Sequence, residues 1–323
     1  MFPGVFNMAL GVARAVAAVV AAFQGTVSGY TSGGLNPAQS PNRLNTIDKF
    51  PFASDGNATD VGDLTVARSG PAGQSSSVSG YTSGGYNGTS RENTIDKFPF
   101  SSDGNATDVG DLTVARDGLG GQSSTASGYT SGGVDPLSSP IQVNIIDKFP
   151  FSSDANATDV GDLTVARNNS AGQSSTDNGY SSGGYDGAAY SNVIDKFPFA
   201  SDGNATDVGD LTVGRNSVTG QSSTASGYTS GGFSFPPSTY HNIIDKFPFA
   251  SDGNATDVGD LTVARSNSVG QSSDASGYTS GGFYNPPNTY YNTIDKFPFA
   301  ADGNATDVGD LTVARSYVAG QQV

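Results

Sequence analysis

The sequence of 323 residues contains no cysteine and no tryptophan, and its single histidine is His241. The absence of cysteine excludes a disulfide framework and thiol-based catalysis. Charged residues make up only 14% of the chain, and 30 acidic residues against 15 basic ones give a formal net charge of −15. Most lysines and arginines recur at two fixed places in a repeat, so no basic stripe can displace counterions from a phosphate backbone. We therefore expect no nucleic acid among the partners, and no cofactor.

What the sequence does contain is a repeat of about 50 residues. Between Asn93 and Gly133 the unit reads as an NTIDKFPF run, then SSDGNATDVGDLTVAR, GQSS and SGYTSGG. The isoleucine of the IDKF run marks the same position in each copy: Ile47, Ile95, Ile146, Ile194, Ile244 and Ile294. A period of this length indicates a repeat architecture, in which each unit buries its apolar face against its neighbours.

Each unit predicts four short antiparallel strands. Apolar residues stand among polar ones in Thr94–Phe100, and Asp103-Gly104 suits a tight hairpin turn, after which Ala106–Leu112 would run back. The small residues of Gly121–Ser124 predict another strand. Ser127–Thr130 predicts its partner, which ends at a double glycine whose freedom at positive φ suits a strand exit. Four antiparallel strands are the content of one propeller blade.

This order of strands resembles the kelch repeat. A kelch unit has a small-residue inner strand, a second strand with an aromatic residue that ends in Gly-Gly, a third with an aspartate-rich exit and a fourth that runs to an arginine. The runs GQSS, GYTSGG, IDKFPF and DVGDLTVAR follow that order over residues 26–323. The sequence departs from the pattern in the fourth strand, where Val61 and its equivalents replace the usual tryptophan. The sequences SGYTSGG and ATDVGDLTVAR also look like the repeats of kelch-like virion proteins of marine bacteriophages. The resemblance implies an all-β, six-bladed kelch-like β-propeller.

The repeats begin and end in the middle of a blade, which predicts how the ring closes. Gly29–Gly34 supplies a second strand with no inner strand before it, and Gly320–Val323 supplies an inner strand with no second strand after it. If these two segments complete one blade, every type of strand occurs six times. Residues 26–323 are thus expected to form one ring, closed by the C-terminal strand and without free sheet edges.

Residues 1–25 differ from the repeats and predict an apolar α-helix. Three interpretations are open for this segment: a packing helix, a membrane anchor or an export signal. Its only charge, Arg14, lies in the middle, whereas an export signal carries its basic residues first. A central arginine also costs about 2.5–3.5 kcal/mol in a membrane span. We expect a helix that drives assembly with other virion proteins or with copies of itself. Its face is formed by residues at helical spacing, namely Val5, Met8, Val12, Val16, Val19, Val20 and Phe23.

The polar residues of the repeat predict neither a metal site nor an enzyme. Asp55–Asp60 offers oxygen ligands, but it lacks the glycine and distal glutamate of an EF-hand loop, and a hairpin turn explains it. Asn57-Ala58-Thr59 has the form of a glycosylation acceptor, which we interpret as turn chemistry. Asp63 and Arg68 are expected to form an ion pair that repeats around the ring. Catalysis needs convergent groups, but these candidates recur six times around a ring, and His241 has no evident partner.

Two connections of each unit differ between copies, and both are expected on one face of the propeller. They run from the second to the third strand, and from the fourth strand to the first strand of the next unit. Aromatic residues and prolines concentrate in the second-to-third loops, where rigid apolar side chains suit an interface. Phe233 and Phe283 could instead pack back over their blades as local core. The candidate partner-binding residues are Tyr185, Tyr190, Phe233, Phe235, Tyr240, His241, Tyr284, Tyr290 and Tyr291.

These features predict a non-enzymatic structural or interaction protein. The phage resemblance implies a virion component, in capsid or tail, that assembles through residues 1–25 and binds a host surface or glycan through its variable loops. The alternative is a cell-surface or secreted propeller whose aromatic loops bind glycans.

Overall fold

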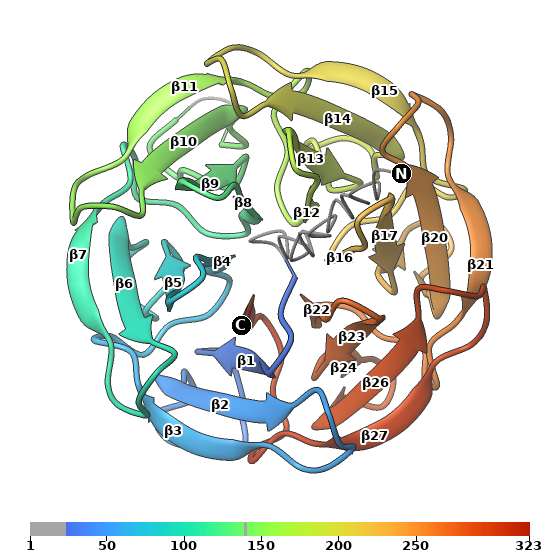
Figure 1. Ribbon diagram of the computed structural model, residues 1–323. Coiled ribbons are helices and arrows are strands. Elements are labelled where there is room, and N and C mark those ends of the chain that lie inside the picture. The colour runs from blue at the N-terminus through green and yellow to red at the C-terminus, as the bar shows by residue number, and fades with distance from the viewer. Residues whose placement is uncertain (1–23, 139–140) are drawn as a thin grey trace, which may run out of the picture.

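The computed structural model describes residues 24–138 and 141–323, and all regular structure within these ranges is β. Six four-stranded antiparallel sheets surround a central axis as the blades of a propeller (Figure 1). Two short hairpins supplement two of the blades. The expected all-β, six-bladed propeller is therefore confirmed for the described part of the chain.

Every blade uses the same four sequence runs in the same order from the axis outward (Figure 1). The inner strands are β4 (Ala72–Ser75), β8 (Gly120–Ser123), β12 (Ala171–Ser174), β16 (Thr219–Ser222), β22 (Val269–Ser272) and β28 (Ala319–Gln322). The second strands are β1 (Ser28–Ser32), β5 (Ser79–Ser83), β9 (Ser127–Ser131), β13 (Asn178–Ser182), β17 (Ser226–Ser230) and β23 (Ser276–Ser280).

The outer half of each blade comes from the IDKFP and TDVGD runs. The third strands are β2 (Thr46–Pro51), β6 (Thr94–Pro99), β10 (Ile145–Pro150), β14 (Val193–Pro198), β20 (Ile243–Pro248) and β26 (Thr293–Pro298). The outer strands are β3 (Thr59–Asp63), β7 (Thr107–Asp111), β11 (Thr158–Asp162), β15 (Thr206–Asp210), β21 (Thr256–Asp260) and β27 (Thr306–Asp310). The two added hairpins are β18 (Phe233–Ser234) with β19 (Thr239–Tyr240), and β24 (Phe283–Tyr284) with β25 (Thr289–Tyr290).

The apolar core is divided into six clusters, each between two neighbouring blades. In one of them, Tyr30 and Ile47 of one blade pack against Phe98 and Phe100 of the next. The centroid of the Tyr30 ring lies 5.5 Å from that of Phe98 and 5.0 Å from that of Phe100. The core is therefore made between repeats, which is why one unit cannot bury its apolar residues alone.

The glutamines of the inner strands join each blade to the next. Each glutamine Nε2 donates to a backbone carbonyl of the tyrosine in the second strand of the following blade, at 2.9–3.1 Å. The series starts with Gln74 and Tyr129 and closes with Gln321 and Tyr81, so the six bonds form a complete ring. Because these glutamines are buried, each bond satisfies a polar group that water cannot reach.

The inner strands approach one another so closely that only glycine fits between them. A Cβ on Gly220 would fall inside contact distance of the Gly172 carbonyl oxygen, and the same relation recurs around all six blades.

We expect Gly220→Ala to lower the free energy of unfolding by about 1–3 kcal/mol, as overpacking does. Gly253, at a turn, has nothing within 4 Å of an added Cβ. Gly253→Ala is the matched control, expected within about 0.5 kcal/mol of wild type in urea unfolding. Equal losses of unfolding free energy in Gly220→Ala and Gly253→Ala would contradict close packing of the inner strands at the axis.

The expected ion pair of Asp63 with Arg68 is wrong, because Arg68 pairs with an aspartate of the next blade. Its Nη2 lies 2.8 Å from Oδ2 of Asp96 on β6, and both side chains are 0% exposed. The backbone N–H and the hydroxyl of Thr65 donate to the same carboxylate at 3.0 and 2.6 Å. Equivalent pairs at 2.8–3.1 Å occupy all six junctions. The connection from one blade to the next is thus bound, through Thr65 and Arg68, to the blade that follows it.

The expected tight turn at Asp103-Gly104 is also wrong. The third and outer strands are joined by the longer connection Phe100–Ala106, and Gly104 does not take positive φ. The side chains of this connection serve the preceding blade instead. Asp103 accepts a bond from Lys49 Nζ at 3.1 Å, and Asn105 Oδ1 accepts the N–H of Asp63 at 3.0 Å. The connection Phe100–Ala106 therefore contacts the preceding blade.

The ring closes as the sequence predicts. Strand β28 pairs with β1, with Gln321 opposite Tyr30 and Ala319 opposite Ser32. Beyond the strand, the carbonyl of Val323 accepts the N–H groups of residues 26, 27 and 28 at 2.7–3.0 Å. The first and last segments of the propeller thus complete one blade (Figure 1).

The predicted N-terminal helix, with its face from Val5 to Phe23, lies outside the described residues. Gln24 and Gly25, which we assigned to that segment, already contact the propeller. Gln24 Nε2 donates to the Ser273 carbonyl at 3.1 Å, and Gly25 N–H donates to the Ser272 carbonyl at 2.8 Å. In the described part of the chain, no helix has the length and apolarity of a membrane span.

Candidate functional site

The two variable connections meet on one face of the propeller, as expected. Residues that follow the arginine of one blade form β-bridges with residues that follow the double glycine of the next, such as Ser69 with Tyr86 and Asn168 with Tyr185. The double glycines take positive φ, for example 67° at Gly132 and 109° at Gly133. We call this the variable face. The opposite face, the uniform face, carries the DGNATD turns and the Lys–Asp pairs.

Aromatic side chains on the variable face form a continuous chain across three neighbouring blades. Successive ring centroids lie 4.9–6.3 Å apart. Such distances are those of tilted and edge-to-face aromatic pairs. All members are half-buried. We call this chain the aromatic ridge: Tyr185, Tyr190, Phe233, Tyr240, Phe283, Tyr284 and Tyr290.

The ridge contains six of the nine predicted binding residues and adds Phe283. Phe233 and Phe283 lie at its centre, each in contact with a tyrosine of its own hairpin and with one of another loop. They are therefore neither isolated surface residues nor fully buried core. Burial raises the pKa of Tyr240 and of Tyr290 above the ordinary value of a tyrosine hydroxyl.

Three predicted residues lie apart from the ridge. Phe235 is 58% exposed at the tip of its hairpin. Tyr291 is half-buried, and the guanidinium carbon of Arg265 lies 5.9 Å from its ring centroid. His241 Nε2 is 2.8 Å from the hydroxyl of Ser234, and burial, followed by the charge of Arg215, lowers its pKa. His241 and Tyr291 therefore contribute to loop structure.

A second aromatic contact, not predicted from the sequence, lies on the other side of the variable face. Tyr86 is held between Arg43 and Arg91, whose guanidinium carbons lie 4.5 and 5.0 Å from its ring centroid. Arg91 also pairs with Asp117 at 3.0 Å. These two arginines stand outside the repeat, which was the signal available in the sequence. The variable face thus has an aromatic half, whose loops 185–191, 233–241 and 283–291 contain Asp186 as their one charged side chain, and a half with cationic residues.

The mouth of the central channel on this face is framed by a ring of backbone hydrogen bonds. Each N–H donates to the carbonyl of the equivalent residue in the preceding blade, at 2.8–2.9 Å, and the series closes on itself. The six residues take φ values of 54–68°. Only two are glycine, so four side chains adopt a conformation that L-residues rarely take. The ring consists of Gly70, Gly118, Asn169, Ser217, Asn267 and Tyr317.

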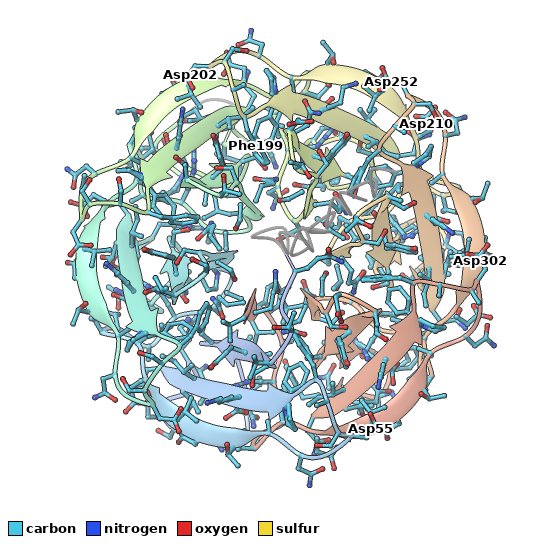
Figure 2. All side chains as sticks on the ribbon, in the orientation of Figure 1. Asp55, Phe199, Asp202, Asp210, Asp252 and Asp302 are labelled. Atoms are coloured by element: carbon cyan, nitrogen blue, oxygen red, sulfur yellow. The ribbon has the colours of Figure 1, made fainter. Side chains whose placement is uncertain are left out.

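The central channel is lined by the inner strands of the six blades. The inner strands enclose a cavity of about 130 Å³, lined by glycine, alanine, serine, threonine, glutamine and a few apolar residues, with no titratable side chain. Within the same residues, no group of three or more His, Cys, Asp or Glu side chains could hold a metal ion. Asp55, Asp202, Asp252 and Asp302 are spread around the circumference (Figure 2). Acidic groups so distributed cannot converge on one substrate.

The net negative charge is concentrated on the outer strands. Each buried arginine and each lysine of the repeat is paired with one aspartate. The two aspartates of each TDVGD strand, such as Asp60 and Asp63, have no basic partner among the described ion pairs. Charged residues on an exposed edge strand oppose pairing with other sheets. The aspartates of the outer strands therefore oppose pairing with other sheets at the rim of the ring.

No protein-family model matches the sequence, and no curated protein matches it.

Proposed function

We propose that this propeller is a non-enzymatic structural and interaction protein, which binds through the aromatic ridge and assembles through residues 1–23. The observation that carries the proposal is the ridge: a continuous set of aromatic side chains on the one face where the repeats differ. Interfaces are enriched in aromatic residues and depleted of charge at their centre. The hairpin segments 233–241 and 283–291 contain no Asp, Glu, Lys or Arg.

The kelch-like strand order and the amino-acid sequence of the repeat support the proposal that the protein is a virion component, in capsid or tail. A closed ring with bonds at every junction suits a particle exposed to proteases, because its blades leave only short sheet edges, which carry aspartates. Other virion proteins or further copies of the chain are the proposed partners of residues 1–23. A host surface is a further proposed partner of the variable face.

Removal of residues 1–23 is expected to convert an assembled protein into a folded monomer. The predicted helix face of the segment carries seven large apolar side chains, and each contributes about 1.5–3 kcal/mol when it is buried. The deletion keeps Gln24 and Gly25, whose bonds to Ser273 and Ser272 belong to the ring. Mass photometry of both proteins measures the assembly state, and circular dichroism checks the fold. The same oligomer with and without residues 1–23 would contradict the assembly role.

Glycan binding is the second candidate function, because asparagine, serine and threonine flank the aromatic rings. Asn285, Asn288 and Ser238 are exposed beside the ridge, where they can bond to sugar hydroxyls while the rings contact the sugar faces. A glycan array with residues 24–323 separates the two functions. Strong binding that is lost on substitution of ridge tyrosines favours an extracellular or cell-surface glycan-binding propeller over a virion component.

A further inference from the structure

Arg43 is the one basic side chain in the described part of the chain that forms no ion pair. The lysines of the repeat pair with aspartates on the uniform face, and the arginines of the repeat are buried against aspartates at the blade junctions. Arg91 pairs with Asp117. Nη1 of Arg43 donates instead to the amide oxygen of Asn42, at 3.1 Å. In a protein with 30 acidic and 15 basic residues, a half-buried cation without an internal anion is a candidate site for an anion from outside.

The guanidinium of Arg43 is held in place by the loop of the neighbouring blade. Its carbon lies 4.5 Å from the centroid of the Tyr86 ring. The hydroxyl of Tyr86 donates to the carbonyl of Gly88 at 2.9 Å, which fixes the ring against its own loop. Gly88 has a φ of 105°, and a Cβ added to it would lie 3.0 Å from Nη1 of Arg43, so the glycine leaves room for the guanidinium. A guanidinium ordered in this way loses less conformational freedom when it binds an anion.

A second cation contacts the same ring, but an aspartate already neutralises it. The guanidinium carbon of Arg91 lies 5.0 Å from the ring centroid, and its Nε donates to Oδ1 of Asp117 at 3.0 Å. Glu92, the acidic residue of this loop, accepts a bond from the side-chain amide of Asn87. Arg43 is therefore the main candidate donor to a bound anion, and Asp117 limits what Arg91 can add.

An equivalent place on the variable face shows that the fold does not require a cation here. Gln142 forms a β-bridge with the first residue of its own loop, as Arg43 does. Its Oε1 lies 2.9 Å from a Cβ added to Gly187, which corresponds to Gly88. The hydroxyl of Tyr185 donates to the Gly187 carbonyl at 2.8 Å, as in the other loop. Since a neutral amide fills the equivalent place, the charge of Arg43 is not needed for packing.

We propose that Arg43 binds a carboxylate or sulfate group of an acidic glycan, with Arg91 adding positive charge beside it. The planar guanidinium matches two oxygens of such a group. The exposed residues nearby, Asn42, Thr89 and Ser90, are uncharged and hydrogen-bonding, which suits sugar hydroxyls better than the side chains of an acidic peptide. The inference rests on glycan binding by the variable face, the second candidate function above, and names the class of glycan.

The test measures binding of fluorescent oligosaccharides to the full chain by anisotropy. The acidic probes are oligogalacturonate and a sulfated dextran oligosaccharide, which distinguish a carboxylate from a sulfate ligand. Their neutral counterparts are the methyl ester of the oligogalacturonate and the unmodified dextran oligosaccharide. Salt at about 0.15 M, where the Debye length is about 8 Å, screens repulsion by distant aspartates. We expect at least one acidic probe to bind about tenfold more tightly than its neutral counterpart, because charge-assisted hydrogen bonds are stronger than neutral ones.

Arg43→Gln is expected to remove this preference for acidic probes. The variant copies Gln142 of the equivalent loop, so the fold should tolerate it. It should weaken binding of the acidic probe about tenfold, as expected for the loss of a hydrogen bond to a charged group, and leave binding of the neutral probe unchanged. The matched control is Lys97→Gln, which removes one positive charge from the uniform face and should bind both probes like wild type. Melting curves check that each variant is folded.

Asp117→Asn is expected to change the affinity in the opposite direction. The variant copies Asn168, at the equivalent position of a later repeat, and removes the carboxylate that competes for Arg91. Binding of the acidic probe should therefore become several-fold tighter. Equal binding of acidic and neutral probes, or equal affinity of the wild-type protein and Arg43→Gln for the acidic probes, would overturn the inference while leaving glycan binding intact. Failure of all four probes to bind would overturn the inference together with glycan binding by this face.

Discussion

Deletion of residues 319–323 is expected to open the ring and to lower the free energy of unfolding by on the order of 5 kcal/mol or more. The deleted strand pairs with β1, and its Gln321 donates to Tyr81 and Thr82 of the next blade and to Ser32. Each buried polar group left without a partner costs about 1–3 kcal/mol, and several are left at once. Strand β1 would become an exposed edge at the axis.

Thermal unfolding followed by circular dichroism measures this effect. A peptide of residues 317–323 added to the truncated protein should raise its melting temperature again, because it restores the missing strand by β-pairing. The same peptide should leave the intact protein unchanged, since its strand position is filled. A melting curve unaffected by the deletion would be incompatible with closure through β28.

Substitution of one buried aspartate at a blade junction is the second change with a large expected effect. In Asp245→Asn, the guanidinium of Arg215 loses the carboxylate that lies 3.0 Å away, and both side chains are 0% exposed. Burial already lowers the pKa of Arg215, and the Asp245 carboxylate is the first of the groups that raise it. Breaking a buried pair from one side costs about 3–5 kcal/mol. The loss is measured as the shift of the urea midpoint.

The next residue of the same strand supplies the control. Lys246 pairs with Asp302 at 2.8 Å, but its side chain is 30% exposed and that of Asp302 is 56% exposed. Exposed pairs contribute about 0–1 kcal/mol, and Lys246→Met keeps the apolar stem that covers Tyr228. If Lys246→Met and Asp245→Asn destabilise the protein equally, the buried ring of arginines is not what fastens the blades.

The uniform and variable faces differ in how their side chains take part in contacts between blades. On the uniform face, Lys–Asp pairs repeat six times, beside five DGNATD connections and one DANATD connection, and these side chains make contacts between blades. On the variable face, the buried Arg–Asp pairs that join the blades do not include side chains of the variable loops. The loops can therefore differ in sequence while these pairs are kept. Tyr291 contacts Arg265 and His241 contacts Ser234, whereas Tyr240 and Tyr290 contact other rings of the ridge.

The amino-acid sequence by itself determined the architecture, because the relevant signals are local or periodic. The repeat length, the four short runs of each unit and the half-blades at Gly29–Gly34 and Gly320–Val323 predict the number of blades and the closing strand. They also identify the loops that differ, and with them most residues of the ridge. None of these conclusions requires knowing which side chains pair between neighbouring blades.

Only the tertiary structure decided the partners between blades. Since all six units have nearly the same sequence, a pattern cannot show whether Arg68 pairs with Asp63 before it or with Asp96 after it. That choice depends on how the connection between blades crosses to the next sheet. The same reason hid the use of Asp103 and Asn105 by the preceding blade. It also hid the ridge as one surface, because its rings meet only when blade packing brings neighbouring hairpins within contact distance.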